Sequence, residues 1–269
     1  MRILFATDGS RGAAIAEDFL LSLPLSCADE VTVVTSPTVS ERESFALLAR
    51  RRWRFAARDV PTTTAMRGGS PARVAEAVAL ERGSELIVVG SRGLGQLGGR
   101  LLGSVARALA RDGVTPVLVV RARREAPRRV LVAIDGSDDA RAAVELLARL
   151  PLPMAARLSL LRVMAPEDDP GQSDAVAAHA RVVLGKRIAD WETVERGHIG
   201  EEVLRRALRT SSDMIVLGSR GQAEGGGLLR GSTVDHVLSH AHCAVLVAKA
   251  PPRARAVESP AAVRIASAF

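Results

Sequence analysis

Cysteine, aromatic residues and long apolar runs are all scarce in this chain of 269 residues. The two cysteines, Cys27 and Cys243, cannot build a disulfide framework and neither belongs to a CxxC pair, so we expect a reducing compartment. Aromatic residues make up 3% and tyrosine is absent, which removes the stacking platforms of single-strand nucleic-acid binders. No apolar run approaches the roughly 20 residues that span a bilayer. We therefore expect a soluble, cytoplasmic protein without a signal peptide or a membrane span.

An excess of basic residues is the one feature of the composition that points toward a polyanionic partner. The formal net charge is +7, and most of the positive charge comes from arginine. The arginines are spread along the chain and mixed with acidic residues, for example at Arg11, Arg50 to Arg52 and Arg205. Scattered surface charge explains this pattern better than a binding face does, so we expect neither nucleic acid nor membrane as a partner.

A unit of about 120 residues occurs twice, with the order and spacing of its segments kept, as in a duplicated domain. Three segments of the first copy match three of the second: Arg2–Ser10 (RILFATDGS) with Arg129–Ser137 (RVLVAIDGS), Ser84–Gly93 (SELIVVGSRG) with Ser212–Gly221 (SDMIVLGSRG), and Thr115–Ala122 (TPVLVVRA) with Cys243–Ala250 (CAVLVAKA). A repeat of this length is a small domain rather than a solenoid unit. We expect domains at residues 1–122 and 128–250, joined by a short charged linker, and a loosely ordered tail at 251–269.

Each half alternates short apolar runs with segments of helical length. Runs such as ILFA, VTVV, LIVV and VLVV are typical of strands buried on both faces of a parallel sheet. Ser10 and Ser137 are suited to cap the helix after the first strand. Asp138 and Asp139 fall in the first turn of one such helix, and Ser70 precedes a proline at another helix start. The third strand of each half, in VPTTTAM and DWETVE, is indicated less clearly. The pattern predicts two tandem open α/β domains, each a mostly parallel five-stranded sheet with helices on both faces.

A glycine frame follows the fourth strand of each half. It reads Gly-x2-Gly-x9-Gly-Ser from Gly90 to Ser104 and again from Gly218 to Ser232, although the residues between the glycines differ. Open α/β sheets bind ligands beyond the carboxyl ends of their strands, and a helix N-terminus offers N–H donors and partial positive charge to a phosphate. We interpret the frame as a phosphate-binding loop. The alternative, in which the glycines only turn the chain, is weakened because the spacing survives in both copies.

This frame, the first strand ending in Asp-Gly-Ser and the closing PVLVV strand together resemble the universal stress protein family in its tandem form. The resemblance covers both halves, over roughly residues 1–250. It implies a Rossmann-like fold of the adenine nucleotide alpha hydrolase type and binding of ATP with Mg²⁺. It also implies that the two domains pair through their last strands as an internal pseudo-dimer, and that two chains can associate further.

The resemblance assigns contacts with the adenine nucleotide to positions in both halves. In the first half these are Ala6, Thr7, Asp8, Ser36, Val89, Gly90, Gly93, Gly103, Ser104 and Val105. In the second half they are Ala133, Ile134, Asp135, Val163, Leu217, Gly218, Gly221, Gly231, Ser232 and Thr233. The sequence departs from the family in two ways. The second strands end in VVTS and LLRV, where the family often has a histidine, and Arg230 stands where an apolar residue is usual.

The chemistry indicated by these residues is binding rather than fast catalysis. Asp8 and Asp135 follow their strands directly, so each carboxylate could hold the sugar or Mg²⁺, which we favour, or cap the following turn. No P-loop lysine follows either frame and no general base stands out. We expect a stress-response regulator with at most slow ATP hydrolysis or phosphorylation of Ser104 or Ser232. The alternatives are an ATP-hydrolysing or adenylyl-transfer enzyme of the same α/β group and a nucleotide-free interaction scaffold.

Three histidines near the end of the second half raise the question of a metal. His236 and His240 are four residues apart and share a helix face, with His242 just beyond. Metal sites use such spacing, but no partner carboxylate or cysteine pattern is evident, so we expect surface or interface histidines and no metal site. We also expect Trp53 and Trp191 to pack, and Arg50 to Arg52 to form a solvated helix face.

Overall fold

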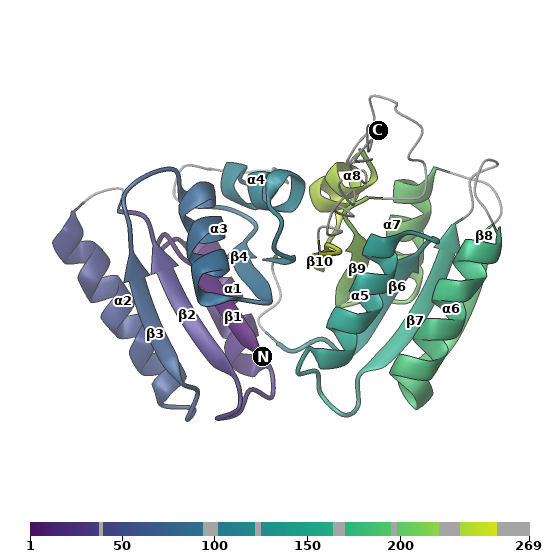
Figure 1. Ribbon diagram of the computed structural model, residues 1–269, viewed down its shortest axis with the longest axis horizontal. Coiled ribbons are helices and arrows are strands. Elements are labelled where there is room, and N and C mark those ends of the chain that lie inside the picture. Colours follow the sequence, from purple (N-terminus) through teal and green to yellow (C-terminus); the bar gives the residue numbers. More distant parts are fainter. Residues whose placement is uncertain are drawn as a thin grey trace, which may run out of the picture.

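The computed structural model describes residues 1–37, 40–93, 102–121, 125–163, 170–194, 198–220 and 232–251 (Figure 1). The first half comprises β1 (Arg2–Ala6), α1 (Arg11–Ser22), β2 (Glu30–Thr35), α2 (Glu41–Ala56), β3 (Thr62–Met66), α3 (Pro71–Arg82), β4 (Leu86–Gly90), α4 (Ser104–Asp112) and β5 (Val117–Val120). The second half comprises β6 (Arg129–Ile134), α5 (Asp138–Arg149), β7 (Arg157–Val163), α6 (Pro170–Leu184), a 3₁₀ turn (Gly185–Arg187), β8 (Ile188–Val194), α7 (Ile199–Arg209), β9 (Met214–Gly218), α8 (Ser232–His240) and β10 (Ala244–Ala248). Apart from Pro251, the predicted tail lies outside the described residues.

The strands of both halves form a single ten-stranded sheet with the order β3-β2-β1-β4-β5-β10-β9-β6-β7-β8. All pairs within a half are parallel, as predicted, and β3 and β8 confirm the two strands that the sequence indicated less clearly. The two halves meet at one antiparallel pair, β5 with β10, in which Leu118 lies opposite Leu246. This is the pairing of last strands that the resemblance implied.

Alternate residues of the buried strands serve opposite faces of the sheet. In β1, Ile3 and Phe5 pack into one core cluster and Leu4 into the other. Helices α1, α2, α5 and α6 contribute to the first cluster, and α3, α4, α7 and α8 to the second. Each run of consecutive apolar residues is thus explained by a strand covered on both sides by helices, which confirms the predicted layers. Among the described residues, none of the helices combines the length and the apolar character needed to cross a membrane.

The helix starts follow the expected capping chemistry, with one difference. The Ser10 hydroxyl accepts a hydrogen bond from the Ala13 N–H at 3.2 Å, and Ser137 accepts one from Ala140 at 3.1 Å. Ser70 does occupy the position before α3, but its side chain makes no capping hydrogen bond. A proline at the first helical position removes one unpaired N–H, so this helix start depends less on a side-chain cap.

Two predictions about α2 are wrong. Arg51 is buried and pairs with the fully buried carboxylate of Glu17 on α1, and Arg54 also reaches Glu17 at 2.6 Å. The arginine run is therefore not a uniformly solvated face, because one member of it turns inward to meet an acid. Trp53 is 71% exposed rather than packed. Trp191 behaves as expected, since it packs against the core and lies beneath the Arg181 guanidinium.

Two buried cationic side chains form hydrogen bonds between the halves. Lys249, just after β10, donates hydrogen bonds to the carbonyl oxygens of Leu109, at 2.7 Å, and Gly113 at the end of α4. Arg121, just after β5, donates to the Leu238 carbonyl near the end of α8. Each half thus places a cation at the C-terminal end of the other half's last helix, where free carbonyls and the helix dipole favour positive charge. Helices α4 and α8 lie side by side above this junction (Figure 1).

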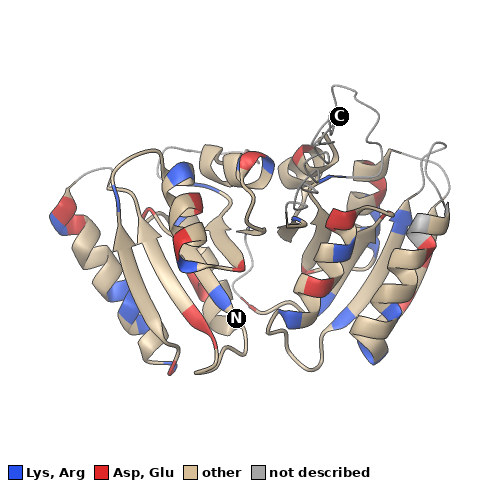
Figure 2. Cartoon of the chain, viewed as in Figure 1, with Lys and Arg blue, Asp and Glu red and all other residues tan. Residues whose placement is uncertain are grey.

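Charge elsewhere is mixed in sign. Figure 2 shows Lys and Arg interspersed with Asp and Glu over the helices of both halves, without a continuous basic band in this view.

Candidate functional site

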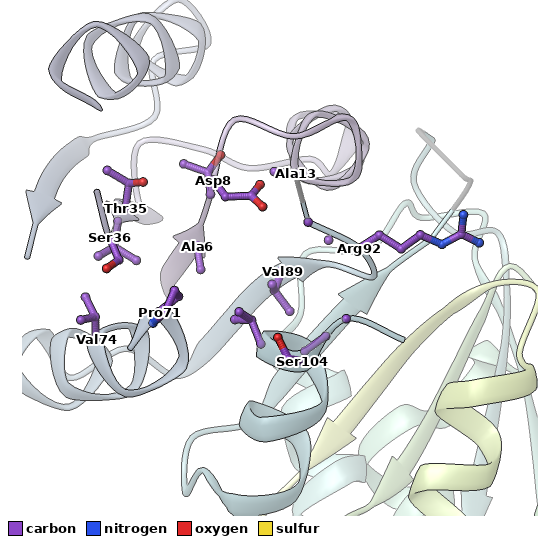
Figure 3. A pocket seen from close by; sticks show the side chains of 17 residues that line it. Ala6, Asp8, Ala13, Thr35, Ser36, Pro71, Val74, Val89, Arg92 and Ser104 are labelled. Atoms are coloured by element: carbon purple, nitrogen blue, oxygen red, sulfur yellow. The ribbon is translucent and has the colours of Figure 1, made fainter. Parts of the chain in front are cut away.

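A cavity of about 430 Å³ opens at the carboxyl ends of β1, β2 and β4 in the first half (Figure 3). All ten positions predicted for this half line it: Ala6, Thr7, Asp8, Ser36, Val89, Gly90, Gly93, Gly103, Ser104 and Val105. The remaining lining residues come from the start of α1, the end of β2, the start of α3, the glycine frame and the first turn of α4. The sequence segments that predicted a site therefore converge on one hollow, at the switch point where ligands of open α/β sheets bind.

The wall of the cavity differs in character from one side to the other. Val34 and the α3 residues Pro71 and Val74 give an apolar wall, whereas Asp8, just after β1, and Ser104, at the start of α4, present oxygen atoms. Three further residues with hydroxyl groups also line the cavity: Thr7, Thr35 and Ser36. Of the described lining residues, Asp8 and Arg92 carry charge. In Figure 3 the Arg92 side chain extends away from the other labelled residues, so it does not act as a clamp over the cavity.

The turn after β1 fixes the position of the Asp8 carboxylate. Gly9 adopts a positive φ of 77°, a conformation that favours glycine, and lets the chain reverse into α1. One carboxylate oxygen of Asp8 accepts the Ser10 N–H at 3.0 Å, while Thr7 donates its own N–H to the Val34 carbonyl at 2.9 Å. Asp8 therefore supports the turn, as one interpretation of its sequence position predicted, and it also lines the cavity. Whether its carboxylate holds a sugar or Mg²⁺ stays a prediction.

The glycines of the frame have separate roles. A Cβ added to Gly90 would lie 2.5 Å from the backbone of Gly12, and one added to Gly12 would overlap the Arg92 carbonyl. These two glycines allow α1 to approach the end of β4 closely, so Gly90 has a packing role as well as a place in the cavity wall. A Cβ on Gly93 would lie 2.5 Å from the second carboxylate oxygen of Asp8, so this glycine leaves room for that side chain in the cavity.

The last glycine of the frame opens α4 toward the cavity. Gly103 is the N-cap residue, its N–H donates to the Ser91 carbonyl at 2.8 Å, and no side chain caps this end of the helix. The first helical residues, Ser104, Val105 and Ala106, line the cavity. N–H groups in the first turn of a helix lack partners inside the helix and sit at the positive end of its dipole. This wall is therefore suited to an anion.

In the second half, the predicted positions that the structure describes lie at the corresponding strand ends and helix start. Ala133 and Ile134 end β6 and Asp135 follows it, Val163 ends β7, Leu217 and Gly218 end β9, and Ser232 and Thr233 begin α8. Asp135 accepts the Ser137 N–H at 3.0 Å, as its counterpart does in the first half. Gly221, Arg230 and Gly231 lie outside the described residues, so these predictions stay untested.

Asp139 is the residue whose importance the sequence did not reveal. It stands at the position of Gly12, is 3% exposed, and accepts hydrogen bonds from the Ser219 hydroxyl (2.5 Å) and the Arg220 N–H (2.9 Å). It also accepts the Ala250 N–H, at 2.9 Å. Burial by itself would raise the pKa of Asp139, but the hydrogen bonds from Ser219 and Arg220 outweigh it and hold the pKa below the ordinary value. The signal was the glycine-to-aspartate difference between the aligned repeats.

The fold and this site define a tandem, Rossmann-like α/β protein with a ligand cavity at the carboxyl end of its sheet. A sequence model of the universal stress protein family matches residues 1–121 and 127–249, and the chain belongs to that family. A universal stress protein of Mycobacterium tuberculosis is 31% identical over 201 residues, which are 66% of this chain and 66% of that protein. One of Mycobacterium bovis is 32% identical over 195 residues, or 64% of each chain. The match thus spans just under two thirds of the length of these relatives.

Solved structures support the fold. The crystal structure of a universal stress protein from Archaeoglobus fulgidus superposes with a TM-score of 0.69, covers 93% of this chain and 98% of its own, and is 20% identical. A putative universal stress protein from Pseudomonas aeruginosa superposes with a TM-score of 0.59, covers 92% of each chain and is 18% identical. Both similarities extend over the two halves, so the tandem arrangement is shared as well as the single domain.

Proposed function

We propose that the first-half cavity binds an adenine nucleotide, ATP with Mg²⁺, and that the chain is a stress-response regulator rather than a fast enzyme. The observation that carries this proposal is the cavity itself, in which the Asp8 carboxylate, the Ser104 hydroxyl, an apolar wall and an uncapped helix N-terminus face one space. Its volume of about 430 Å³ falls within the range of small-molecule sites.

The ligand is oriented by the two kinds of wall. The adenine ring packs against Val34, Pro71 and Val74, where the cavity offers apolar contact. The phosphates approach Ser104 and Val105 at the start of α4, where N–H groups and the helix dipole compensate negative charge. The ribose lies between these walls, beside Asp8.

Mg²⁺ fits the donor set on the polar side. The Asp8 carboxylate and the Ser104 hydroxyl are oxygen donors of the kind that Mg²⁺ prefers, and this ion is usually bound by one or two carboxylates together with substrate phosphates. When bound, the ion would neutralise phosphate charge that no lining arginine or lysine among the described residues is directed to meet.

We expect any ATP hydrolysis or phosphoryl transfer at this site to be slow. None of the described lining residues is a histidine, glutamate or lysine, and the one lining carboxylate, Asp8, already accepts the Ser10 N–H and is proposed to hold the ribose or Mg²⁺. Positioning with charge stabilisation is what accelerates phosphoryl transfer. The second half is proposed to bind in the corresponding place, with Asp135, Ser232 and Thr233 in the matching roles.

Calorimetric titration with Mg-ATP tests the proposal. We expect micromolar binding, of the order of −8 kcal/mol, to the folded chain. Gly103→Val should abolish one equivalent of binding because it places a side chain at the phosphate wall, and Gly231→Val should abolish the other. Gly68→Ala is the matched control, since a Cβ there meets nothing within 4 Å. An absence of heat with correctly folded wild-type protein contradicts the proposal.

Two further measurements separate the alternatives. Mass spectrometry of gently purified protein should detect a co-purifying adenine nucleotide, which a nucleotide-free scaffold would not contain. ATP turnover above about one per second would instead favour an enzyme of the same α/β group.

A further inference from the structure

A cluster of metal-ligating side chains lies where α7 begins beside α8 in the second half. His198 directly precedes α7, Glu201 belongs to its first turn and His236 lies in the middle of α8. One ligand atom from each of the three lies within 4.8 Å of the other two. Zinc bonds to imidazole nitrogen and carboxylate oxygen are about 2.0–2.2 Å long, so small side-chain rotations bring all three atoms within reach of one ion.

The packing of the two helices produces this convergence. Gly200 faces His236 at the helix crossing, where an added Cβ would lie 2.9 Å from the His236 Cδ2 atom. The missing side chain lets the His236 ring rest on the first turn of α7, with its centroid 5.3 Å from that of His198. The ring of His240, one turn further along α8, lies 4.5 Å from that of His236, and its Nδ1 lies 2.9 Å from the His236 carbonyl oxygen. The His236 ring therefore contacts two other histidines, and one of its nitrogen atoms belongs to the cluster.

The first half supplies an internal comparison. Because α3 aligns with α7 and α4 with α8, the positions of His198, Glu201 and His236 are occupied there by Ser70, Arg73 and Ala108. The same crossing in the first half thus carries a cation and no metal-ligating group. The three metal-ligating groups, two imidazoles and one carboxylate, occur together in one copy of a duplicated scaffold. The fold itself does not require them, because the other copy has the same elements without them.

We propose that His198, Glu201 and His236 form a binding site for one divalent transition-metal ion per chain, with Zn²⁺ as the best match. Two imidazole nitrogens and one carboxylate oxygen form a donor set used by zinc, whereas Mg²⁺ and Ca²⁺ prefer oxygen donors throughout. His198 and Glu201 are exposed, so the fourth position faces solvent and accepts water. The bound ion links the start of α7 to the middle of α8. The proposal departs from our expectation of no metal site and does not depend on nucleotide binding.

The experiment is a Zn²⁺ titration of the tag-free, full-length chain after removal of metals with a chelator. We expect one equivalent to bind, and Co²⁺ in its place to give visible absorption typical of nitrogen and oxygen ligation. Glu201→Gln, at an exposed position that leaves the fold intact, and His236→Ala should each weaken binding by at least about tenfold, because even outer-shell partners of a metal contribute that much. His242→Ala is the control and should leave the affinity unchanged.

Three results overturn the proposal. One is the absence of stoichiometric Zn²⁺ binding by the folded wild-type chain. Another is binding that both Glu201→Gln and His236→Ala leave unchanged. The third is binding that Cys27→Ser or Cys243→Ser abolishes, since a thiolate would then hold the ion. Circular dichroism of each variant shows that it is folded, so a lost equivalent reports on the site itself.

Discussion

The two halves differ in how the start of the first helix contacts the segment that follows the fourth strand. In the first half Gly12 has no side chain, and the start of α1 lies directly against the backbone of Arg92. In the second half Asp139 stands at that position, and its buried carboxylate joins Ser219, Arg220 and Ala250. Gly90 and Gly218 are required in both, because a Cβ on either would come within 3 Å of the helix start. The two copies of the fold thus keep the same geometry, although the contact of Gly12 with the Arg92 backbone is replaced in the second copy by the hydrogen-bond network of Asp139.

The largest effect should come from removing the carboxylate of this network. Asp139→Ala leaves the N–H groups of Arg220 and Ala250 without their acceptor inside the protein, so we expect the free energy of unfolding to fall by about 3–5 kcal/mol. Denaturant titration measures the loss. Asp138→Ala is the matched control, because Asp138 is exposed in the same helical turn and should cost less than about 1 kcal/mol. Equal losses in the two variants would show that the network adds nothing.

The next effect concerns the cations that join the halves. Burial is the main cause that lowers the pKa of Lys249 from 10.5 to about 8. Between these two values the unfolded chain binds more protons than the folded one, so the contribution of Lys249 to stability rises with pH. We expect the wild type to gain on the order of 3 kcal/mol relative to Lys249→Met across this window. Arg121→Met should show no such pH dependence, since a guanidinium stays charged there. A stability difference between the wild type and Lys249→Met that does not change with pH contradicts the prediction.

The smallest effect on stability should come from replacing Gly12, the first-half counterpart of Asp139. Gly12→Ala pushes a methyl group into the Arg92 carbonyl and must separate α1 from β4, at a cost of about 1–3 kcal/mol. Gly68→Ala, with open space around the added atom, should change stability by less than about 0.5 kcal/mol. The thermal midpoints of the two variants give the comparison. A stable Gly12→Ala protein would mean that the helix start has room to move.

Much of the fold could be predicted from local patterns in the sequence, and the positions that line the first-half cavity could be predicted from the glycine frame together with the family resemblance. Continuous apolar runs predict buried parallel strands, and repeated segments predict two copies. The parallel arrangement then brings Asp8, Val89 and Ser104 to one edge, since the carboxyl ends of neighbouring strands meet there. Positions far apart in sequence could be assembled because sheet topology, rather than side-chain detail, decides where they lie.

Contacts between side chains of different helices could not be predicted in this way. A single helix pattern does not show that Arg51 turns inward, because that depends on the acidic residue that α1 presents, Glu17. The partners of His236 were missed for the same reason, since His198 and Glu201 belong to another helix. The glycine of α7 that lets the helices approach has no counterpart in the pattern of α3, where Ala72 stands at that position.

The central antiparallel pair has a consequence for how this molecule responds to dilution. Two separate domains joined through β5 and β10 would fall apart as their concentration dropped below the dissociation constant. Here one covalent chain carries both strands, so each always experiences its partner at a high effective concentration. The contact between Leu118 and Leu246 should therefore persist at nanomolar protein, whether or not two chains associate further.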